Sequence, residues 1–190
     1  MILIRSRVML ADIVENTSGP IRLHIGCGSR LFDGYLNIDG EYMQGTTGVI
    51  LHDITKPFPI PDNSVDEILS VHVIEHIMPD KVPPMLKEWH RIIKPEGFAA
   101  TEWPDLLKMC QFIVEDPSRL YSDNRKVLKQ GIAGIFGNIT RYQDVAMMHK
   151  WGYSTDSLGK LLTEAGFGEI VVEPNKYPKT PMCSRVVAYK

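Results

Sequence analysis

The chain of 190 residues has 44% hydrophobic residues and a net charge of −2, values typical of one globular domain. The near-neutral charge argues against nucleic acid as the main partner. Cys27, Cys110 and Cys183 show no CxxC spacing, which argues against a disulfide framework or a cysteine-based zinc site. We find neither an apolar run of about 18 residues nor a clean signal-peptide core. We therefore expect a cytoplasmic protein without a membrane partner.

The hydrophobic pattern predicts strands that alternate with helices along most of the chain. Predicted strands cover residues 21–25, 35–38, 65–71, 98–103, 168–173 and 184–190, with a further strand that ends near His52. Predicted helices cover residues 6–14, 83–93 and about 154–165. Residues 94–97 are expected to form a turn. This alternation favours a mostly parallel, doubly wound α/β sheet.

One region interrupts the alternation. Residues 104–150 contain two helix-like pieces and a glycine-punctuated loop. We interpret the region as a helical insertion before the final helix. The whole chain, 1–190, is then a single domain with an N-terminal segment at 1–19.

Glycines and carboxylates follow the ends of successive predicted strands. Gly26 and Gly28 follow the first strand, Asp39 ends the second, Asp53 follows the third and His72 follows the fourth. In doubly wound sheets, ligands bind beyond the carboxyl ends of the strands. One carboxylate can accept hydrogen bonds from a ribose diol, and the next can accept from an adenine amine. The pattern indicates a ligand that contains adenosine.

The glycine loop also limits which adenosine ligand fits. A dinucleotide-binding loop has a third glycine and an acidic residue about 20 positions further on. Leu31 occupies the position of that third glycine, and Asp39 follows Gly28 by only 11 residues. A phosphate-free ligand such as S-adenosylmethionine therefore fits better than NAD. An NAD-binding oxidoreductase is kept as a disfavoured alternative.

Several blocks, in order along the chain, resemble class I S-adenosylmethionine-dependent methyltransferases of the type 11 family. They are LHIGCGS, GYLNID, LHDITKPFPIPDNSVDEILSVHVIEHI, LKEWHRIIKPEGFAATEWPD and HKWGYSTDSLGKLLTEAGF. The resemblance covers about residues 20–190 and is poorest at 104–146. It implies a Rossmann-like fold with a seven-stranded, mostly parallel sheet, an antiparallel last strand, and S-adenosylmethionine as the cofactor.

The resemblance also implies roles for individual residues. The methionine part of the cofactor would meet the backbone of the glycine loop, the ribose would meet the end of the second strand, and the methyl group would lie at the end of the fourth. The implied cofactor-binding residues are Gly26, Cys27, Gly28, Asp39, Gly40, Asp53, Ile54, Val71 and His72. The segment between Gly28 and Tyr35 is shorter than is usual in the class. We hypothesise that the N-terminal segment covers the face of the sheet left bare.

The sequence HVIEH at 72–76 also matches the HxxEH pattern of zinc hydrolases. That pattern needs both histidines on one face of a continuous helix, whereas His72 is predicted to end a strand. We therefore expect no metal and treat zinc hydrolysis as a minor alternative. His76 is interpreted as a structural residue at the start of a helix.

The predicted activity is methyl transfer to a small-molecule acceptor. An acceptor that loses a proton needs a base, and histidine titrates in the right range. His72 is the first candidate for a catalytic base and His149 the second. A catalytically inactive S-adenosylmethionine-binding protein is the main alternative. The acceptor and the oligomeric state stay open at this stage.

Overall fold

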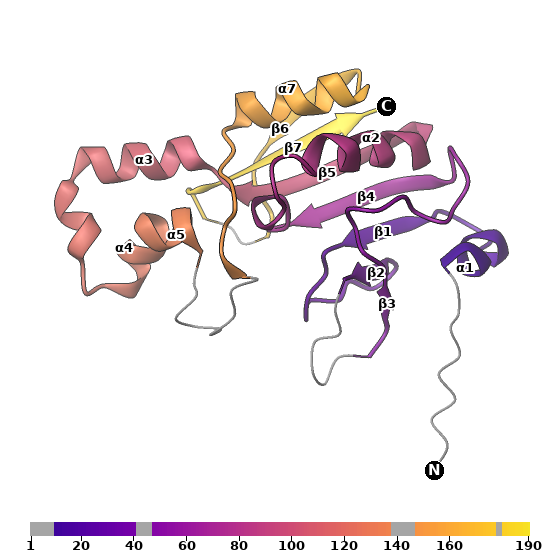
Figure 1. Ribbon diagram of the computed structural model, residues 1–190, viewed down its shortest axis with the longest axis horizontal. Coiled ribbons are helices and arrows are strands. Elements are labelled where there is room, and N and C mark those ends of the chain that lie inside the picture. The colour runs from indigo at the N-terminus through magenta and orange to yellow at the C-terminus, as the bar shows by residue number, and fades with distance from the viewer. Residues whose placement is uncertain (1–9, 41–46, 138–146, 178–179) are drawn as a thin grey trace, which may run out of the picture.

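The computed structural model describes residues 10–40, 47–137, 147–177 and 180–190. Its centre is a seven-stranded sheet in the order β3-β2-β1-β4-β5-β7-β6 (Figure 1). The strands are β1 (Arg22–Ile25), β2 (Leu36–Asp39), β3 (Val49–Leu51), β4 (Val65–Val71), β5 (Ile93–Pro104), β6 (Glu169–Glu173) and β7 (Cys183–Tyr189). Strands β1 to β5 pair in parallel, and β7 runs antiparallel to β5 and β6. The predicted fold class is confirmed.

Helices α2 (Val82–Ile92) and α7 (Thr155–Ala165) pack side by side on one face of the sheet (Figure 1). Local sequence explains their bounds. Pro83 and Pro84 lie in the first turn of α2, where a missing N–H costs no hydrogen bond. Ser154 and Ser157 form a capping box at the start of α7, and Gly166 ends it in the left-handed conformation.

The prediction of a turn at residues 94–97 is wrong. Strand β5 begins at Ile93, directly after α2, and includes these residues. Val65 pairs with Ile93 and Glu67 pairs with Phe98, so the register shifts between the two pairs. This irregularity absorbs the extra residues that the sequence indicated as a turn.

The two faces of the sheet are covered differently. Helices α2 and α7 and helix α1 (Leu10–Asn16) share one apolar cluster, to which α1 contributes Leu10 and Val14. The smaller cluster around Leu69 and Val187 is covered by Phe32 and Tyr35, which lie in the shortened segment after the glycine loop. The described part of the N-terminal segment therefore does not cover the second face, contrary to our hypothesis. Residues 1–9 lie outside the described residues.

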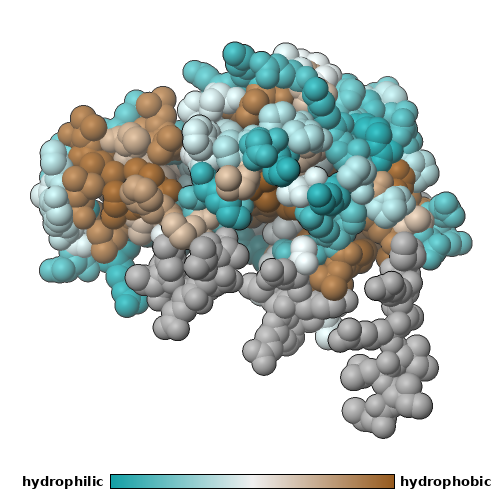
Figure 2. Space-filling model, viewed as in Figure 1, coloured by the Kyte–Doolittle hydropathy of each residue, from teal (hydrophilic) through white to brown (hydrophobic). Residues whose placement is uncertain are grey.

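Among the residues that the structure describes, four short helical elements lie between β5 and α7, where the sequence predicted a helical insertion. They are α3 (Leu106–Glu115), η2 (Pro117–Tyr121), α4 (Arg125–Gln130) and α5 (Ile132–Phe136). Apolar side chains gather on this part of the surface, including the exposed Leu107, Val114 and Phe136 (Figure 2). No helix within the described ranges has the length and apolar content needed to cross a membrane.

Candidate functional site

The glycine loop crosses the end of β2 directly after β1. The backbone N–H groups of Gly26 and Cys27 both donate to the carbonyl of Ile38, at 2.8 and 3.1 Å. Gly26 has a φ of 67°, which favours glycine. A Cβ at this position would lie 2.8 Å from Cγ1 of Val73 and closer still to Cγ2. Close packing against Val73 therefore requires glycine at position 26.

Gly28 differs from Gly26 because the space beside it is open. Its φ is 52°, and a Cβ built there would have no atom of the described residues within 4 Å. Its backbone N–H donates a 2.7 Å hydrogen bond to Oδ2 of Asp39. The carbonyl of Asp39 in turn accepts from the N–H of His52, at 2.9 Å. The ends of β1, β2 and β3 are thereby linked through one residue, Asp39, whose carboxylate accepts from Gly28 and whose backbone carbonyl accepts from His52.

Asp53 follows β3 and lies in a short turn. Its Oδ1 accepts from the N–H and from the hydroxyl of Thr55, at 3.0 and 2.7 Å. These hydrogen bonds lower the pKa of Asp53 below its ordinary value, and the bond from the Thr55 hydroxyl has the largest effect. The side chain of Ile54 is buried in the main apolar cluster, whereas Gly40, at the end of β2, is exposed.

Cys27 has a buried thiol between the two glycines. Burial and the charge of Asp39 raise the pKa of this thiol to about 11. The thiol is therefore neutral at physiological pH, and reactive thiolate chemistry at Cys27 is disfavoured. The backbone remains as the part of Cys27 that can contact a ligand.

His72 comes directly after Val71, the last residue of β4. It adopts a φ of 55°, which is uncommon for a residue with a side chain. Its Nδ1 lies 3.1 Å from Oε1 of Glu75, and its Nε2 lies 3.6 Å from Sγ of Cys183. Burial lowers the pKa of His72, but the contacts with Cys183 and Glu75 outweigh it and raise the pKa to about 10. Both ring nitrogens are thus engaged, which disfavours His72 as a general base.

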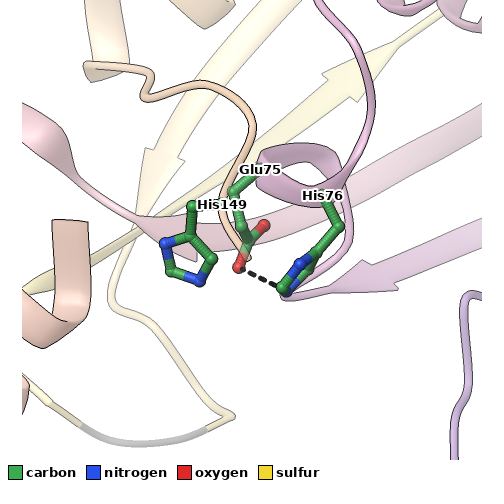
Figure 3. A group of neighbouring side chains, drawn as sticks. All are labelled: Glu75, His76 and His149. Carbon is green, nitrogen blue, oxygen red and sulfur yellow. Dashed lines mark ion pairs between the residues drawn. The ribbon is translucent and has the colours of Figure 1, made fainter. Parts of the chain in front are cut away.

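A cluster of Glu75, His76 and His149 lies beside His72 (Figure 3). We call these three residues the EHH cluster. One ligand atom from each residue lies within 4.8 Å of the others. Oε1 of Glu75 is 4.0 Å from Nε2 of His76, and the two imidazole rings lie edge to face with centroids 4.9 Å apart. The sequence singled out His149, interpreted His76 as structural and gave Glu75 no role.

Backbone hydrogen bonds bring His149 to the cluster from far along the chain. Glu75 and His76 belong to the short 3-10 helix η1 (Ile74–His76) that follows β4. The carbonyl of Glu75 accepts from the N–H of Lys150 at 2.7 Å. Nδ1 of His76 lies 3.1 Å from the carbonyl oxygen of Met148. These bonds fix the 148–150 segment against η1.

Glu75 is a carboxylate held inside the protein, with 2% of its surface exposed. Burial raises its pKa, but the hydrogen bond with His72 and the nearby His76 and His149 outweigh burial and lower it. Oε2 of Glu75 has no hydrogen-bond partner among the residues that the structure describes. Glu75 and His149 also line a cavity of about 10 Å³ under α3 and α5. A volume of this size holds about one water molecule or ion.

The HxxEH residues do not form a helical zinc-hydrolase motif. His72 follows the end of a strand, and η1 is only 3 residues long. His72 and His76 therefore do not share a face of one continuous helix. The predicted strand ends at Val71, one residue before His72, so His72 follows the strand directly, and the geometry disfavours a zinc hydrolase of this type.

Two sequence comparisons match parts of the chain to methyltransferases. A family model described as a methyltransferase domain matches residues 23–101. A stretch of 60 residues is 32% identical to the tRNA N(3)-cytidine methyltransferase METTL2 of Gallus gallus. That match covers 30% of this chain and 16% of the relative, so it spans only a small part of the relative's length.

Solved structures of methyltransferases share the fold. A SAM-dependent methyltransferase from Archaeoglobus fulgidus has a TM-score of 0.60 at 15% identity, over 90% of this chain and 87% of that chain. SAM-dependent methyltransferases from Methanosarcina mazei have a TM-score of 0.59 at 16% identity, and the match covers 96% of this chain and 99% of that chain. Human N-acetylserotonin methyltransferase in complex with SAM has a TM-score of 0.53 at 14% identity, and the match covers 90% of this chain and 47% of that chain.

The match at residues 23–101 and the shared fold confirm the resemblance to class I S-adenosylmethionine-dependent methyltransferases. They also support S-adenosylmethionine as the cofactor.

Proposed function

We propose that this protein binds S-adenosylmethionine at the carboxyl ends of β1 to β4 and transfers its methyl group to a small-molecule acceptor. One observation carries this proposal. The 2.7 Å hydrogen bond from the Gly28 N–H to the Asp39 carboxylate joins the glycine loop to the end of the neighbouring strand. This is the edge of the sheet where ligands bind in doubly wound folds.

The residues at this edge suit S-adenosylmethionine. No atom of the described residues would lie within 4 Å of a Cβ at Gly28 or Gly40, which leaves room for a ligand close to the backbone. Asp39 at the end of β2 and Asp53 after β3 provide carboxylates for a ribose diol and an adenine amine. We assign the ribose to Asp39, adenine to Asp53 with the Ile54 amide, and the methionine part to residues 26–28.

In this proposal Val71 and His72 lie nearest the reacting methyl group, because Val71 ends β4 next to β1 and its glycine loop, and His72 follows directly. S-adenosylmethionine would supply a methyl carbon that forms a bond to the acceptor lone pair while the electron pair of the broken C–S bond stays on sulfur. The protein aligns the acceptor and excludes water. Such alignment can lower a barrier by about 7–11 kcal/mol.

A small molecule is favoured over tRNA as the acceptor. The relative named above acts on tRNA, but the matched stretch is only 60 residues long. The chain has 21 Lys and Arg against 23 Asp and Glu, and tRNA binding draws on a positive surface. The EHH cluster beside His72 instead offers a compact polar wall for a small acceptor.

The test is calorimetric titration of the full chain with S-adenosylmethionine, S-adenosylhomocysteine and NAD. We expect binding of the first two and none of NAD. Transfer of a labelled methyl group is then assayed with a panel of phenols, amines and carboxylates and, separately, with bulk tRNA. Label on a small acceptor supports the proposal. Binding of NAD alone would overturn it, and label on tRNA alone would replace the small molecule by RNA.

A further inference from the structure

We infer that Glu75, His76 and His149 form a site for one divalent transition-metal ion beside the methyl-transfer site. The ligand atoms of the three residues lie within 4.8 Å of one another, and Figure 3 shows the three side chains converging from η1 and the segment before α7. Atoms bound to one zinc ion at about 2.0–2.2 Å lie about 3.4 Å apart. The cluster therefore needs only a small contraction around an ion.

Hydrogen bonding leaves a nitrogen of His76 available to a metal. The carbonyl oxygen of Met148 can only accept, so Nδ1 of His76, 3.1 Å away, carries the proton. The lone pair is then on Nε2, the atom that lies 4.0 Å from Oε1 of Glu75. A backbone carbonyl that holds one ring nitrogen so that the other binds metal is the usual arrangement at histidine ligands.

His149 is held on the opposite side of the cluster. Its backbone N–H donates to the carbonyl of Phe136 at 3.1 Å, and its ring hydrogen bonds to the backbone of Gly134. His149 and His76 therefore approach Glu75 from separate segments, and both rings are fixed by backbone groups. This is pre-organisation of a kind that a solvated surface histidine lacks.

The Glu75 carboxylate has an unsatisfied oxygen, which indicates a bound ligand separately from the spacing of the three side chains. Oε1 contacts His72, but Oε2 has no partner in the part of the chain that the structure describes, although Glu75 is 2% exposed. An unsatisfied carboxylate oxygen inside a protein is costly. The adjoining cavity of about 10 Å³, lined by Glu75 and His149, has room for one ion. A cation bound at the Glu75 carboxylate satisfies Oε2, while Oε1, the oxygen 4.0 Å from Nε2 of His76, keeps its contact with His72, which orients the carboxylate.

The ligand set selects the kind of ion. Two imidazoles and one carboxylate suit Zn²⁺, Co²⁺, Mn²⁺ or Fe²⁺, whereas Mg²⁺ and Ca²⁺ prefer sites made of oxygen atoms. Three protein ligands leave at least one position open. On the proposed function, this position takes an acceptor with a hydroxyl group, whose pKa the ion lowers. His149, the second candidate for a general base in the sequence, then acts as a metal ligand instead.

The experiment measures metal binding without cofactor or acceptor. Chelator-treated full chain is titrated with Co²⁺, followed by visible absorption, and the bound metal is counted by elemental analysis. We expect one ion per chain, with affinity at least tenfold lower in Glu75→Gln, His76→Gln and His149→Gln. His90→Gln, which alters a histidine that packs on Phe167, is the matched control and should keep full affinity. Thermal unfolding of each variant checks that it is folded.

Two outcomes overturn the inference: wild type that binds no Co²⁺ or Zn²⁺, or affinity that is equal in wild type and all three cluster variants. If one variant fails to fold, the other two still decide the question. The proposed function fails separately, because S-adenosylmethionine binding is measured on the same samples. Metal bound without cofactor binding would refute only the methyltransferase proposal, and the reverse would refute only the metal site.

Discussion

The backbone N–H of Gly28 and the carboxylate of Asp39 are joined by a 2.7 Å hydrogen bond. Because Gly28 follows β1 and Asp39 ends β2, this bond holds the loop against the strand end at which we place the ribose. Asp39 therefore has two functions in our account: it shapes the loop and it binds the cofactor.

Asp39→Ala should weaken S-adenosylmethionine binding by about 10- to 100-fold, because hydrogen bonds to a charged group contribute about 1.5–3 kcal/mol. Asp39→Asn keeps an oxygen that can accept from Gly28, so its affinity for S-adenosylmethionine should lie between those of the wild type and Asp39→Ala. Calorimetry measures all three affinities, and Asp123→Ala, at an exposed position on the insertion, is the control. Unchanged affinity in Asp39→Ala would contradict the ribose assignment.

Gly26→Ala and Gly28→Ala should separate stability from binding. Both place a side chain at positive φ, at a cost of about 1–2 kcal/mol. Only the alanine at position 26 also overlaps Val73, which adds about 1–3 kcal/mol. We expect urea unfolding to show the larger loss in the free energy of unfolding for Gly26→Ala. Relative to that loss of stability, calorimetry should show the larger loss of cofactor affinity for Gly28→Ala.

A double variant provides the control for this pair. Val73→Ala removes Cγ1 and Cγ2, the two atoms that a Cβ at position 26 would meet most closely, so it should recover part of the stability lost in Gly26→Ala. It should recover nothing in Gly28→Ala, whose Cβ would not contact Val73 or any other described residue within 4 Å. Strictly additive losses in both double variants would show that the packing against Val73 is not the cause.

Glu102 should be essential for the fold. Its carboxylate is 0% exposed and accepts from Nη1 of Arg185 at 2.9 Å and from the N–H groups of Lys176 and Tyr177 at 2.8 and 2.6 Å. Glu102→Ala leaves the buried Arg185 without this partner and should cost about 3–5 kcal/mol in the free energy of unfolding. Glu173→Ala removes a more exposed partner of Arg185 and should cost about 1 kcal/mol or less. Equal losses in a urea titration would refute this distinction.

Glu88 should make stability depend on pH in the acid range. Its carboxylate accepts from Nη2 of Arg91 at 2.6 Å and from the N–H of Phe58 at 2.7 Å. Burial favours the neutral form, but these bonds outweigh burial and lower the pKa of Glu88. A lowered folded-state pKa adds stability above the unfolded-state pKa of about 4.3, and this contribution disappears as the pH falls through the folded-state pKa.

The measurement compares wild type with Glu88→Gln by chemical unfolding between about pH 6 and about pH 3. Wild type should lose more stability than Glu88→Gln over this interval, because only the wild type must protonate this carboxyl. The two curves should converge at the acid end. Parallel curves over the whole interval would show that Glu88 does not contribute to the acid loss.

Much of the fold was predictable because the hydrophobic pattern and the capping residues in the sequence match the burial and the element ends in the structure. The alternation at 65–71 predicted a strand with the same bounds as β4, and Ser154 and Gly166 marked the two ends of α7. The start of β5 was not predictable, because its register shift depends on pairing with a distant strand. The cover of the second sheet face was also missed, since Phe32 and Tyr35 lie in a segment without periodicity.

The site was predictable only where it follows strand ends. Gly28 and Asp39 come together because parallel neighbours end at the same edge of a sheet. Glu75, His76 and His149 meet through the hydrogen bond between Lys150 and Glu75, which joins distant segments. Nothing in the sequence near His149 indicates that bond. The HxxEH pattern marked Glu75 and His76, but it indicated a helix where the chain forms the short η1.

A crystal structure of the full chain with S-adenosylhomocysteine tests the central claim most directly. We expect the ribose hydroxyls within hydrogen-bond distance of the Asp39 carboxylate, the amino-acid end against the backbone of residues 26–28, and the sulfur facing His72. A ligand bound away from these strand ends, or a ribose with no contact to Asp39, would contradict the account.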